Sequence, residues 1–335
     1  MSSPKDSYNR TIDYLRISIT DRCNLRCVYC MPSEGLRPMG HKEILRYEEI
    51  VRVVTIAAGI GLRKVRITGG EPLARKDVTY LIAALKNIEG IRDLSLTTNG
   101  ILLSRYANKL VEAGLQRINI SLDSLKPDRY EEITRGGDLN LVLRGIEAAE
   151  KAGLSPIKIN MVPIRGINSD EIEDFAKMTL KVPYQIRFIE FMPFGTEGLW
   201  SPEKFISTDE IKSIVEGIGP LIPVKLKRSG PAIYFRFDNA PGVVGFISPI
   251  SNHFCGECNR LRLTADGKLR PCLFSETEID LKPALRGGAP DDEIKRLIKL
   301  SIEVKPERHH IQDTDLLSLM KNKEYCKRPM SRIGG

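Results

Sequence analysis

Three cysteines near the start of the chain could do redox chemistry. Cys23, Cys27 and Cys30 have a Cys-x3-Cys-x2-Cys spacing and supply three thiolates, one fewer than a fully protein-bound iron–sulfur cluster needs. A cubane cluster held at three corners keeps one iron open, where a small molecule with an amine and a carboxylate can coordinate and be reduced. The spacing therefore predicts a reactive centre. Structural zinc is the alternative, although the nearest histidine, His41, lies eleven residues beyond Cys30.

A second group of three cysteines lies near the other end of the chain, namely Cys255, Cys258 and Cys272. No fourth cysteine stands close by, so this group predicts either a second open cluster or a zinc site that His253 completes. Arg260 and Arg262 follow at alternate positions, which aims both side chains to one side of a strand. Guanidinium groups pair bidentately with phosphate or carboxylate, so an anionic ligand is expected there.

The segments that must position these residues alternate between β-rich and helical patterns. Strands are predicted at 16–20, 64–68, 93–97, 117–122, 157–162 and 185–191. Helices are predicted between them at 47–58, 77–86, 102–112, 141–151 and 169–178. This order is typical of a parallel α/β sheet, and six repeats favour a partial (β/α)6 barrel over a complete eight-fold one.

The predicted strands carry polar residues at every second position. These are Arg16, Ser18 and Thr20; Arg66 and Thr68; Ser95, Thr97 and Asn99; Asn119, Ser121 and Asp123; and Lys158 and Asn160. The apolar residues between them must face the covering helices, so the polar set is expected to point into the barrel. Unpaired polar groups in a dry interior are costly, which predicts a bound polar ligand or ordered water. An open sheet with a solvated face is the alternative.

A turn-rich stretch at 193–198 suggests a domain boundary. We expect a barrel domain over residues 8–205 and a smaller C-terminal α+β domain over 206–335 that carries the second cysteine group. Ser207 and Glu210 form a potential capping box for a helix through Val215, and strands are expected at 233–237 and 243–247.

Composition restricts the class of protein. The 51 basic and 43 acidic residues give a net charge of +8, which suits an anionic ligand or nucleic acid equally. No apolar run is long enough to span a membrane, and the first residues lack the apolar stretch of a signal peptide, so a cytoplasmic protein without a membrane partner is expected. Seven cysteines in such a chain indicate metal ligation more than disulfides.

The first cysteine motif, with Tyr29 before its last cysteine, resembles the signature of the radical S-adenosylmethionine (SAM) superfamily. In that superfamily the open iron binds SAM, and one-electron reduction releases a 5'-deoxyadenosyl radical. The second cysteine group, the segment 259–262 and the terminal residues 333–335 narrow the resemblance to the GTP 3',8-cyclase family, which opens molybdenum cofactor biosynthesis. Residues 224–249 carry no motif that can be aligned, and Cys326 has no assigned role.

The resemblance implies two 4Fe–4S clusters, SAM as cofactor and GTP as substrate. The cluster ligands would be Cys23, Cys27, Cys30, Cys255, Cys258 and Cys272, the first three serving the radical chemistry. SAM would be held by Tyr29, Gly70, Ser121 and Met192, with residues 68–72 meeting its amino group. GTP would be held by Arg16, Arg66, Thr97, Lys158, Arg260, Leu261 and Arg262.

The reaction implied is that of a lyase. The deoxyadenosyl radical would take the hydrogen from C3' of the GTP ribose, and the carbon radical would add to C8 of guanine. The product is (8S)-3',8-cyclo-7,8-dihydroguanosine 5'-triphosphate. The second cluster would hold the guanine base, and the Gly-Gly terminus would reach into the active site. A small electron-donor protein, product hand-off to cyclic pyranopterin monophosphate synthase, and a monomer or homodimer are expected.

Two competing functions remain open from the sequence. One is a radical SAM enzyme that acts on a peptide, although such enzymes usually carry more additional cysteines. The other is a zinc-containing nucleic-acid-binding protein, which needs exposed aromatic residues for stacking. Aromatic residues are only 6% of this chain, and its arginines alternate along predicted buried strands, so no nucleic acid is expected as a partner.

Overall fold

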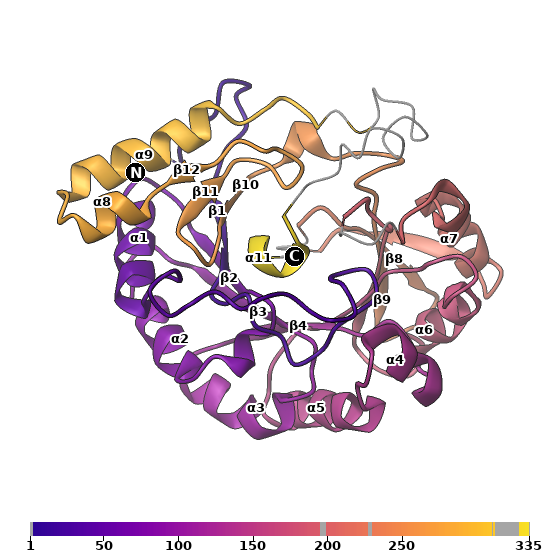
Figure 1. Cartoon of the computed structure of the whole chain (residues 1–335). Coiled ribbons are helices and arrows are strands. Elements are labelled where there is room, and N and C mark those ends of the chain that lie inside the picture. The colour runs from indigo at the N-terminus through magenta and orange to yellow at the C-terminus, as the bar shows by residue number, and fades with distance from the viewer. Residues whose placement is uncertain (1–2, 195–198, 227–229, 310, 312–327, 335) are drawn as a thin grey trace.

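A single curved sheet of twelve strands organises the molecule (Figure 1). The computed structural model describes residues 3–194, 199–226, 230–309, 311 and 328–334, so Cys326 and Gly335 lie outside the described residues. The strand order is β12-β11-β10-β1-β2-β3-β4-β5-β6-β9-β8-β7. The six central strands follow the chain in order, and segments from the C-terminal part of the chain extend the sheet at both edges.

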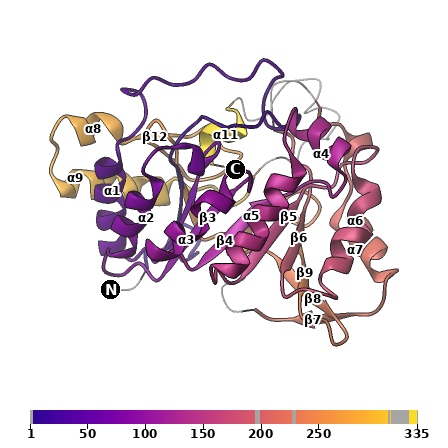
Figure 2. The ribbon, with the colours of Figure 1, turned by 90° about the horizontal axis from the view of Figure 1, so that it is seen from below.

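The central strands form the parallel barrel that the sequence predicts. They are β1 (Tyr14–Ser18), β2 (Lys64–Thr68), β3 (Asp93–Thr98), β4 (Arg117–Ser121), β5 (Ile157–Met161) and β6 (Gln185–Ile189). Their helices are α1 (Tyr47–Gly59), α2 (Val78–Lys86), α3 (Leu103–Glu112), α4 (Pro127–Thr134), α5 (Leu139–Lys151) and α6 (Ile172–Met178). Figures 1 and 2 show α1, α2, α3 and α5 along the outer face of the sheet.

Apolar side chains seal the interface between sheet and helices. Ile17 of β1, Ile67 of β2 and Leu96 of β3 are fully buried in one core cluster. The amphipathic helix α3 adds Leu103 and Leu110, which lie on one face because seven residues make about two helical turns. The apolar half of each strand therefore faces the helices, and the polar half is left for the interior, as predicted.

The C-terminal part of the chain extends the sheet at both edges. β10 (Arg260–Leu263) runs parallel to β1, with Arg262 opposite Arg16, and β9 (Val243–Ile247) runs parallel to β6. The outer strands β7 (Leu221–Val224), β8 (Ile233–Phe237), β11 (Lys268–Arg270) and β12 (Ile279–Asp280) are antiparallel. The pairing of β1 with β10 brings the second cysteine group beside the first strand of the barrel.

The remaining helices are α7 (Thr208–Glu216), α8 (Lys282–Arg286), α9 (Asp291–Glu303) and α11 (Met330–Ile333). Ser207 caps α7 as predicted, since its hydroxyl accepts a hydrogen bond from the Glu210 amide at 3.3 Å. Short 3-10 turns lie at Pro72–Ala74, Ser169–Glu171, Pro202–Lys204 and Cys255–Glu257. None of the described helices is both long and apolar enough to cross a bilayer.

Some predicted boundaries were wrong by a few residues. The first strand begins at Tyr14 and ends at Ser18, because the chain turns at Thr20, whose carbonyl accepts the Gly70 amide. The helix predicted at 169–178 begins at Ile172, since the preceding three residues form a 3-10 turn. The division of the chain at residue 205 stays a prediction.

Candidate active site

One cavity at the C-terminal ends of the barrel strands is lined by both groups of cysteines. The barrel contributes a set of polar side chains to its wall: Arg16, Arg66, Thr68, Thr97, Asn99, Ser121, Asp123, Asn160 and Arg187. The C-terminal part contributes Arg260, Arg262 and Lys305 to the same wall. The prediction that the polar face of the strands surrounds an interior space is therefore confirmed for these residues.

The loop of the first cysteine group follows β1, and backbone hydrogen bonds hold it in place. The amides of Arg26 and Val28 donate to the carbonyls of Thr134 and Ile133 at 3.0 and 2.9 Å. The Cys23 thiol accepts from the Leu25 amide at 3.4 Å, and burial raises its pKa to about 12. Such thiols ionise only beside a strong positive charge, which a bound metal centre supplies.

The Gly69-Gly70 turn lies directly against this loop. The Gly70 amide donates to the Thr20 carbonyl at 2.7 Å, and a Cβ at residue 70 would overlap the Arg22 carbonyl. Next to it, buried Glu71 accepts from the amides of Asn99 and Leu73 at 2.7 and 2.9 Å, and burial raises its pKa to about 7. The turn thus joins the ends of β2 and β3 to the cysteine loop.

Tyr29 is held by a buried carboxyl group. Its hydroxyl donates to Asp123 Oδ2 at 2.5 Å, and Asp123 Oδ1 accepts from the Val162 amide at 2.9 Å. Burial raises the pKa of Asp123 to about 6. Asp123 follows β4 and therefore fixes the aromatic residue of the cysteine loop relative to Ser121, which also lines the cavity.

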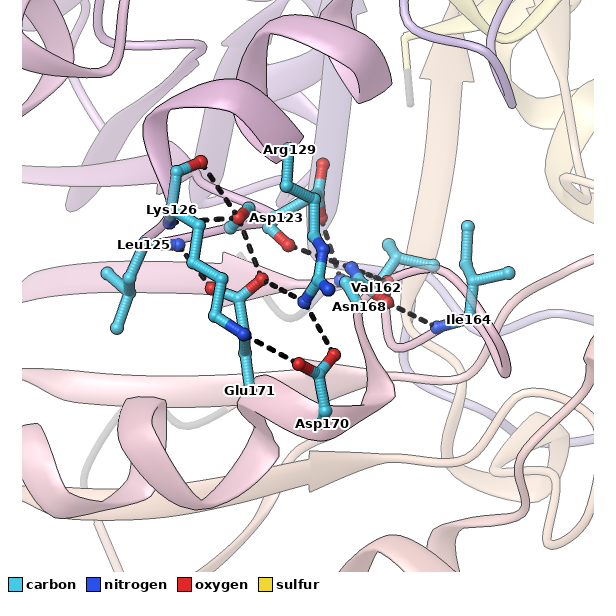
Figure 3. A network of polar contacts seen from close by, with 10 residues as sticks. Asp123, Leu125, Lys126, Arg129, Val162, Ile164, Asn168, Asp170 and Glu171 are labelled. Atoms are coloured by element: carbon cyan, nitrogen blue, oxygen red, sulfur yellow. Dashed lines mark hydrogen bonds and ion pairs between the residues drawn. The ribbon is translucent and has the colours of Figure 1, made fainter.

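A network of polar contacts anchors the segment after β4 (Figure 3). Fully buried Glu171 accepts from the Leu125 amide at 2.6 Å and from Arg129 at 2.8 Å. Asn168 donates to the Asp123 carbonyl at 2.8 Å and to the Val162 carbonyl at 3.1 Å. The segments after β4 and β5 are thereby tied together, which fixes the backbone that presents Asp123.

Positive charge dominates the cavity wall. Burial and the neighbouring Arg262 lower the pKa of Arg16, while burial and Arg260 lower the pKa of Arg262 to about 10. Arg187, which is 3% exposed, donates to Asn119 Oδ1 at 2.6 Å. Like charges this close are unfavourable in a low-dielectric interior, so the wall is suited to a polyanion.

Several buried polar atoms on this wall have no hydrogen-bond partner among the described residues. They are Tyr14 Oη, Thr97 Oγ1, Asn160 Oδ1, Arg187 Nε, His253 Nδ1 and Ser331 Oγ. Native interiors rarely leave such groups unpaired, so their concentration around one cavity indicates a bound ligand.

The second cysteine group contains a thiol that favours ionisation. Burial alone would raise the pKa of Cys258, but the positive charges of Arg260 and Lys305 lower it to about 6. Burial raises the pKa of Cys255. A thiolate beside two cations is a good metal ligand.

A single-ion metal site is not preformed in the described part of the chain. No three His, Cys, Asp or Glu side chains there converge closely enough to hold one ion. Zinc draws its thiolates to within about 2.3 Å of one centre, whereas a cubane cluster takes each thiolate on a different iron. The choice between a cluster and zinc at the second cysteine group stays a prediction.

Two predicted substrate residues lie away from the cavity wall. The Leu261 side chain is fully buried in the hydrophobic core, because it points to the opposite face of β10 from Arg260 and Arg262. Lys158 is 3% exposed and lies with its Nζ 5.9 Å from the centre of the Tyr234 ring. It lines a separate pocket at the other end of β5, so its contact with substrate stays a prediction.

The described end of the C-terminal tail enters the cavity region, and Figure 1 shows α11 at the centre of the curved sheet. Met330 and Ser331 line the cavity, and Arg262 donates to the Gly334 carbonyl at 2.5 Å. Gly334 has a φ of +72°, and a Cβ there would overlap Thr68 Oγ1. The tail therefore fits only because this residue lacks a side chain.

Sequence reasoning missed two charged residues of the site. Arg187 lies on β6, where polar and apolar residues do not alternate regularly, so the sequence carries no clear signal of its inward orientation. Lys305 follows a helix of ordinary amphipathic pattern and carries no signal in the sequence. Met192 and Tyr29, by contrast, lie on the cavity wall, and their contact with SAM stays a prediction.

Two protein-family models match most of the chain. Residues 17–179 match the Radical SAM superfamily, and residues 184–311 match Molybdenum Cofactor Synthesis C. A structure of SuiB from Streptococcus suis bound to S-adenosylmethionine has the same fold, with a TM-score of 0.56, 16% identity, and coverage of 84% of this chain and 66% of that one.

Sequence relatives match over almost the whole length. The GTP 3',8-cyclase of Thermodesulfovibrio yellowstonii is 54% identical over 99% of this chain and 100% of its own. That of Alkaliphilus oremlandii is 51% identical with the same coverage. With both cysteine groups on one arginine-lined cavity in a radical SAM barrel, the chain belongs to the GTP 3',8-cyclase family of the radical SAM superfamily.

Proposed function

We propose that the protein converts GTP to (8S)-3',8-cyclo-7,8-dihydroguanosine 5'-triphosphate, the first step of molybdopterin biosynthesis. The observation that carries this proposal is the single cavity that joins two three-cysteine groups through a wall of guanidinium groups. Membership of the radical SAM superfamily implies a 4Fe–4S cluster and SAM. When bound at the first cysteine group, they supply a 5'-deoxyadenosyl radical.

The residues around the first cysteine group would bind and orient SAM. Gly70 lets the turn after β2 approach the loop closely, and Ser121 and Met192 lie on the same wall. Tyr29, anchored by Asp123, fixes the loop between its second and third cysteines. The task of these residues is to hold two ligands in contact and to exclude water.

The basic wall would bind the GTP triphosphate. Arg16, Arg66 and Arg262 present three guanidinium groups to the cavity, and Arg187 adds a fourth. Arg260 and the hydroxyl of Thr97 are further donors on the same wall. A nucleotide triphosphate would neutralise these charges and satisfy the unpaired donors on the wall.

The second cysteine group would hold a second 4Fe–4S cluster in a C-terminal domain over residues 206–335. Its open iron would bind the guanine base and so fix C8 near C3' of the ribose. Electrons would come from a small redox protein, and the product would pass to cyclic pyranopterin monophosphate synthase. The tail through Gly334 would complete the wall beside Arg262.

Anaerobic reconstitution tests the proposed function. With iron, sulfide and reductant, the chain should bind about eight irons, four per cluster, and should form 5'-deoxyadenosine from SAM only when GTP is present. Peptides and GDP serve as control substrates. Zinc at both sites, or SAM cleavage that depends on a peptide and ignores GTP, would exclude the proposal.

Proton uptake on GTP binding provides a further prediction at Lys158. Burial and the neighbouring charges of Arg187 and Arg117 lower the pKa of Lys158 to about 6, so the free protein holds it mostly neutral at pH 7.5. A bound triphosphate would raise this pKa, and up to one proton should be taken up at pH 7.5 but very little at about pH 5, where the free protein already holds Lys158 protonated. Calorimetry in buffers of different ionisation enthalpy measures this uptake.

The matched variant for this measurement is Lys158→Met, which keeps the length of the side chain and removes its charge. Subtracting its proton uptake from that of the unchanged protein cancels the titration of GTP itself. Identical uptake by both proteins would show that Lys158 does not sense the triphosphate.

A further inference from the structure

Lys305 connects the two segments that carry the second cysteine group. It follows α9, its side chain is buried, and the residue is 3% exposed. Its Nζ donates to the Arg260 carbonyl at 3.0 Å and to the Pro271 carbonyl at 2.6 Å. Arg260 lies two residues after Cys258, and Pro271 directly precedes Cys272. One ammonium group therefore fixes the distance between two cysteine-bearing segments.

Among the described residues, no carboxylate balances the charge of Lys305. No acidic side chain in the described part of the chain lies within ion-pair distance of it. An ammonium group carries three N–H donors, and the two carbonyls accept two of them. A buried cation of this kind is costly unless an anion lies beside it. Lys305 faces the cavity that Cys255, Cys258 and Cys272 line.

Arg10 provides an informative contrast on the outer side of the same loop. It donates to the Cys255 carbonyl at 2.8 Å and to the Pro306 carbonyl at 2.6 Å. Its charge, however, is met by Asp6, whose Oδ2 lies 2.6 Å from Arg10 Nε. The charge of Arg10 is thus paired with a carboxylate of the protein. The charge of Lys305 meets only carbonyl oxygens among the described residues, so negative charge in the cavity would stabilise it.

We propose that Lys305 is a positioning residue and the internal counter-charge of the metal–thiolate centre at the second cysteine group. This inference rests on the part of the proposed function that places a cluster there. A cluster held by three thiolates becomes more negative on reduction, and a fixed cation in a low-dielectric wall stabilises the reduced form. Lys305 should therefore raise the reduction potential of that cluster and favour its retention.

The experiment isolates the second site in the full chain. Cys23, Cys27 and Cys30 are replaced with alanine, so that only the second group gives a spectroscopic signal after anaerobic reconstitution. Lys305→Met, Lys305→Gln and Lys305→Arg are then compared in that background. Iron and sulfide content and the midpoint potential, followed by electron paramagnetic resonance, are measured without SAM or GTP.

We expect Lys305→Met and Lys305→Gln to shift the midpoint potential to more negative values, and Lys305→Arg to keep it near that of the parent. Glutamine can donate to one carbonyl but has no charge, so it separates charge from hydrogen bonding. Lys299→Met removes a lysine charge from an exposed position on α9 and should leave the potential unchanged.

Two results of the potential measurement would overturn the inference. One is a potential in Lys305→Gln equal to that of the parent, because hydrogen bonding alone would then explain the residue. The other is a shift in Lys299→Met as large as that in Lys305→Met. If Lys305→Met loses the cluster, retention by Lys305→Arg but not by Lys305→Gln supports the charge role, and the reverse pattern contradicts it. GTP-dependent SAM cleavage by the unchanged chain tests the cyclase separately.

Discussion

Replacing Gly70 with alanine is expected to reduce SAM cleavage by at least about 100-fold. The new Cβ would overlap the Arg22 carbonyl carbon and oxygen and would lie 2.8 Å from the Asp21 carbonyl oxygen. These atoms belong to the backbone of the cysteine loop, which cannot move aside as a flexible side chain can. A displacement of about 1 Å at a reacting centre costs on the order of 100-fold in rate. Deoxyadenosine formation with saturating GTP measures the loss.

Gly59→Ala is the matched control for this substitution. Gly59 ends α1, and a Cβ there would meet no atom within 4 Å. This variant should retain its iron and its activity, since alanine also favours the helix. If Gly70→Ala cleaves SAM at the normal rate, the close approach of the glycine turn to the cysteine loop is not needed for cofactor binding.

Replacing Arg262 with alanine is expected to weaken GTP binding by about 10- to 150-fold while SAM binding is kept. Loss of a charge-assisted hydrogen bond costs about 1.5–3 kcal/mol, which corresponds to this range. Arg262 also holds the Gly334 carbonyl, so the variant should release the tail as well. Equilibrium binding of GTP and of SAM to the reconstituted protein distinguishes the two ligands.

The control for Arg262 is Arg296→Ala on α9, where an exposed arginine pairs with Glu293 at 2.8 Å. It removes the same charge without touching the cavity, so both affinities should stay unchanged. Equal losses of GTP and SAM affinity in Arg262→Ala would contradict the division of the cavity into a nucleotide side and a SAM side.

Most of the barrel could be predicted from the sequence, because the type of each strand and helix depends on residues that lie close together in the chain. The alternation of polar and apolar residues in β2 fixes which face meets the helices, and the segments 64–68, 233–237 and 243–247 have the predicted limits. The cysteine spacings likewise identified both candidate centres. Inward residues such as Arg16 and Thr97 followed from the same alternation and line the cavity.

Long-range pairing could not be predicted from such patterns. The parallel contact of β10 with β1 joins residues almost 250 positions apart, and no local pattern specifies it. The same pairing buries Leu261, a residue assigned through the resemblance, while its neighbours face the cavity. Lys305 reaches the site only because the end of α9 is packed beside these strands, so its role could not emerge before the fold was known.

The pairing of β1 with β10 also determines when the cavity can form during synthesis of the chain. Because Arg16 meets Arg262 across these strands, the nucleotide side of the cavity does not exist until most of the polypeptide has left the ribosome. The loop of the first cysteine group, by contrast, emerges early in synthesis. The cavity wall around those thiols is therefore completed only after the C-terminal strands have been synthesised.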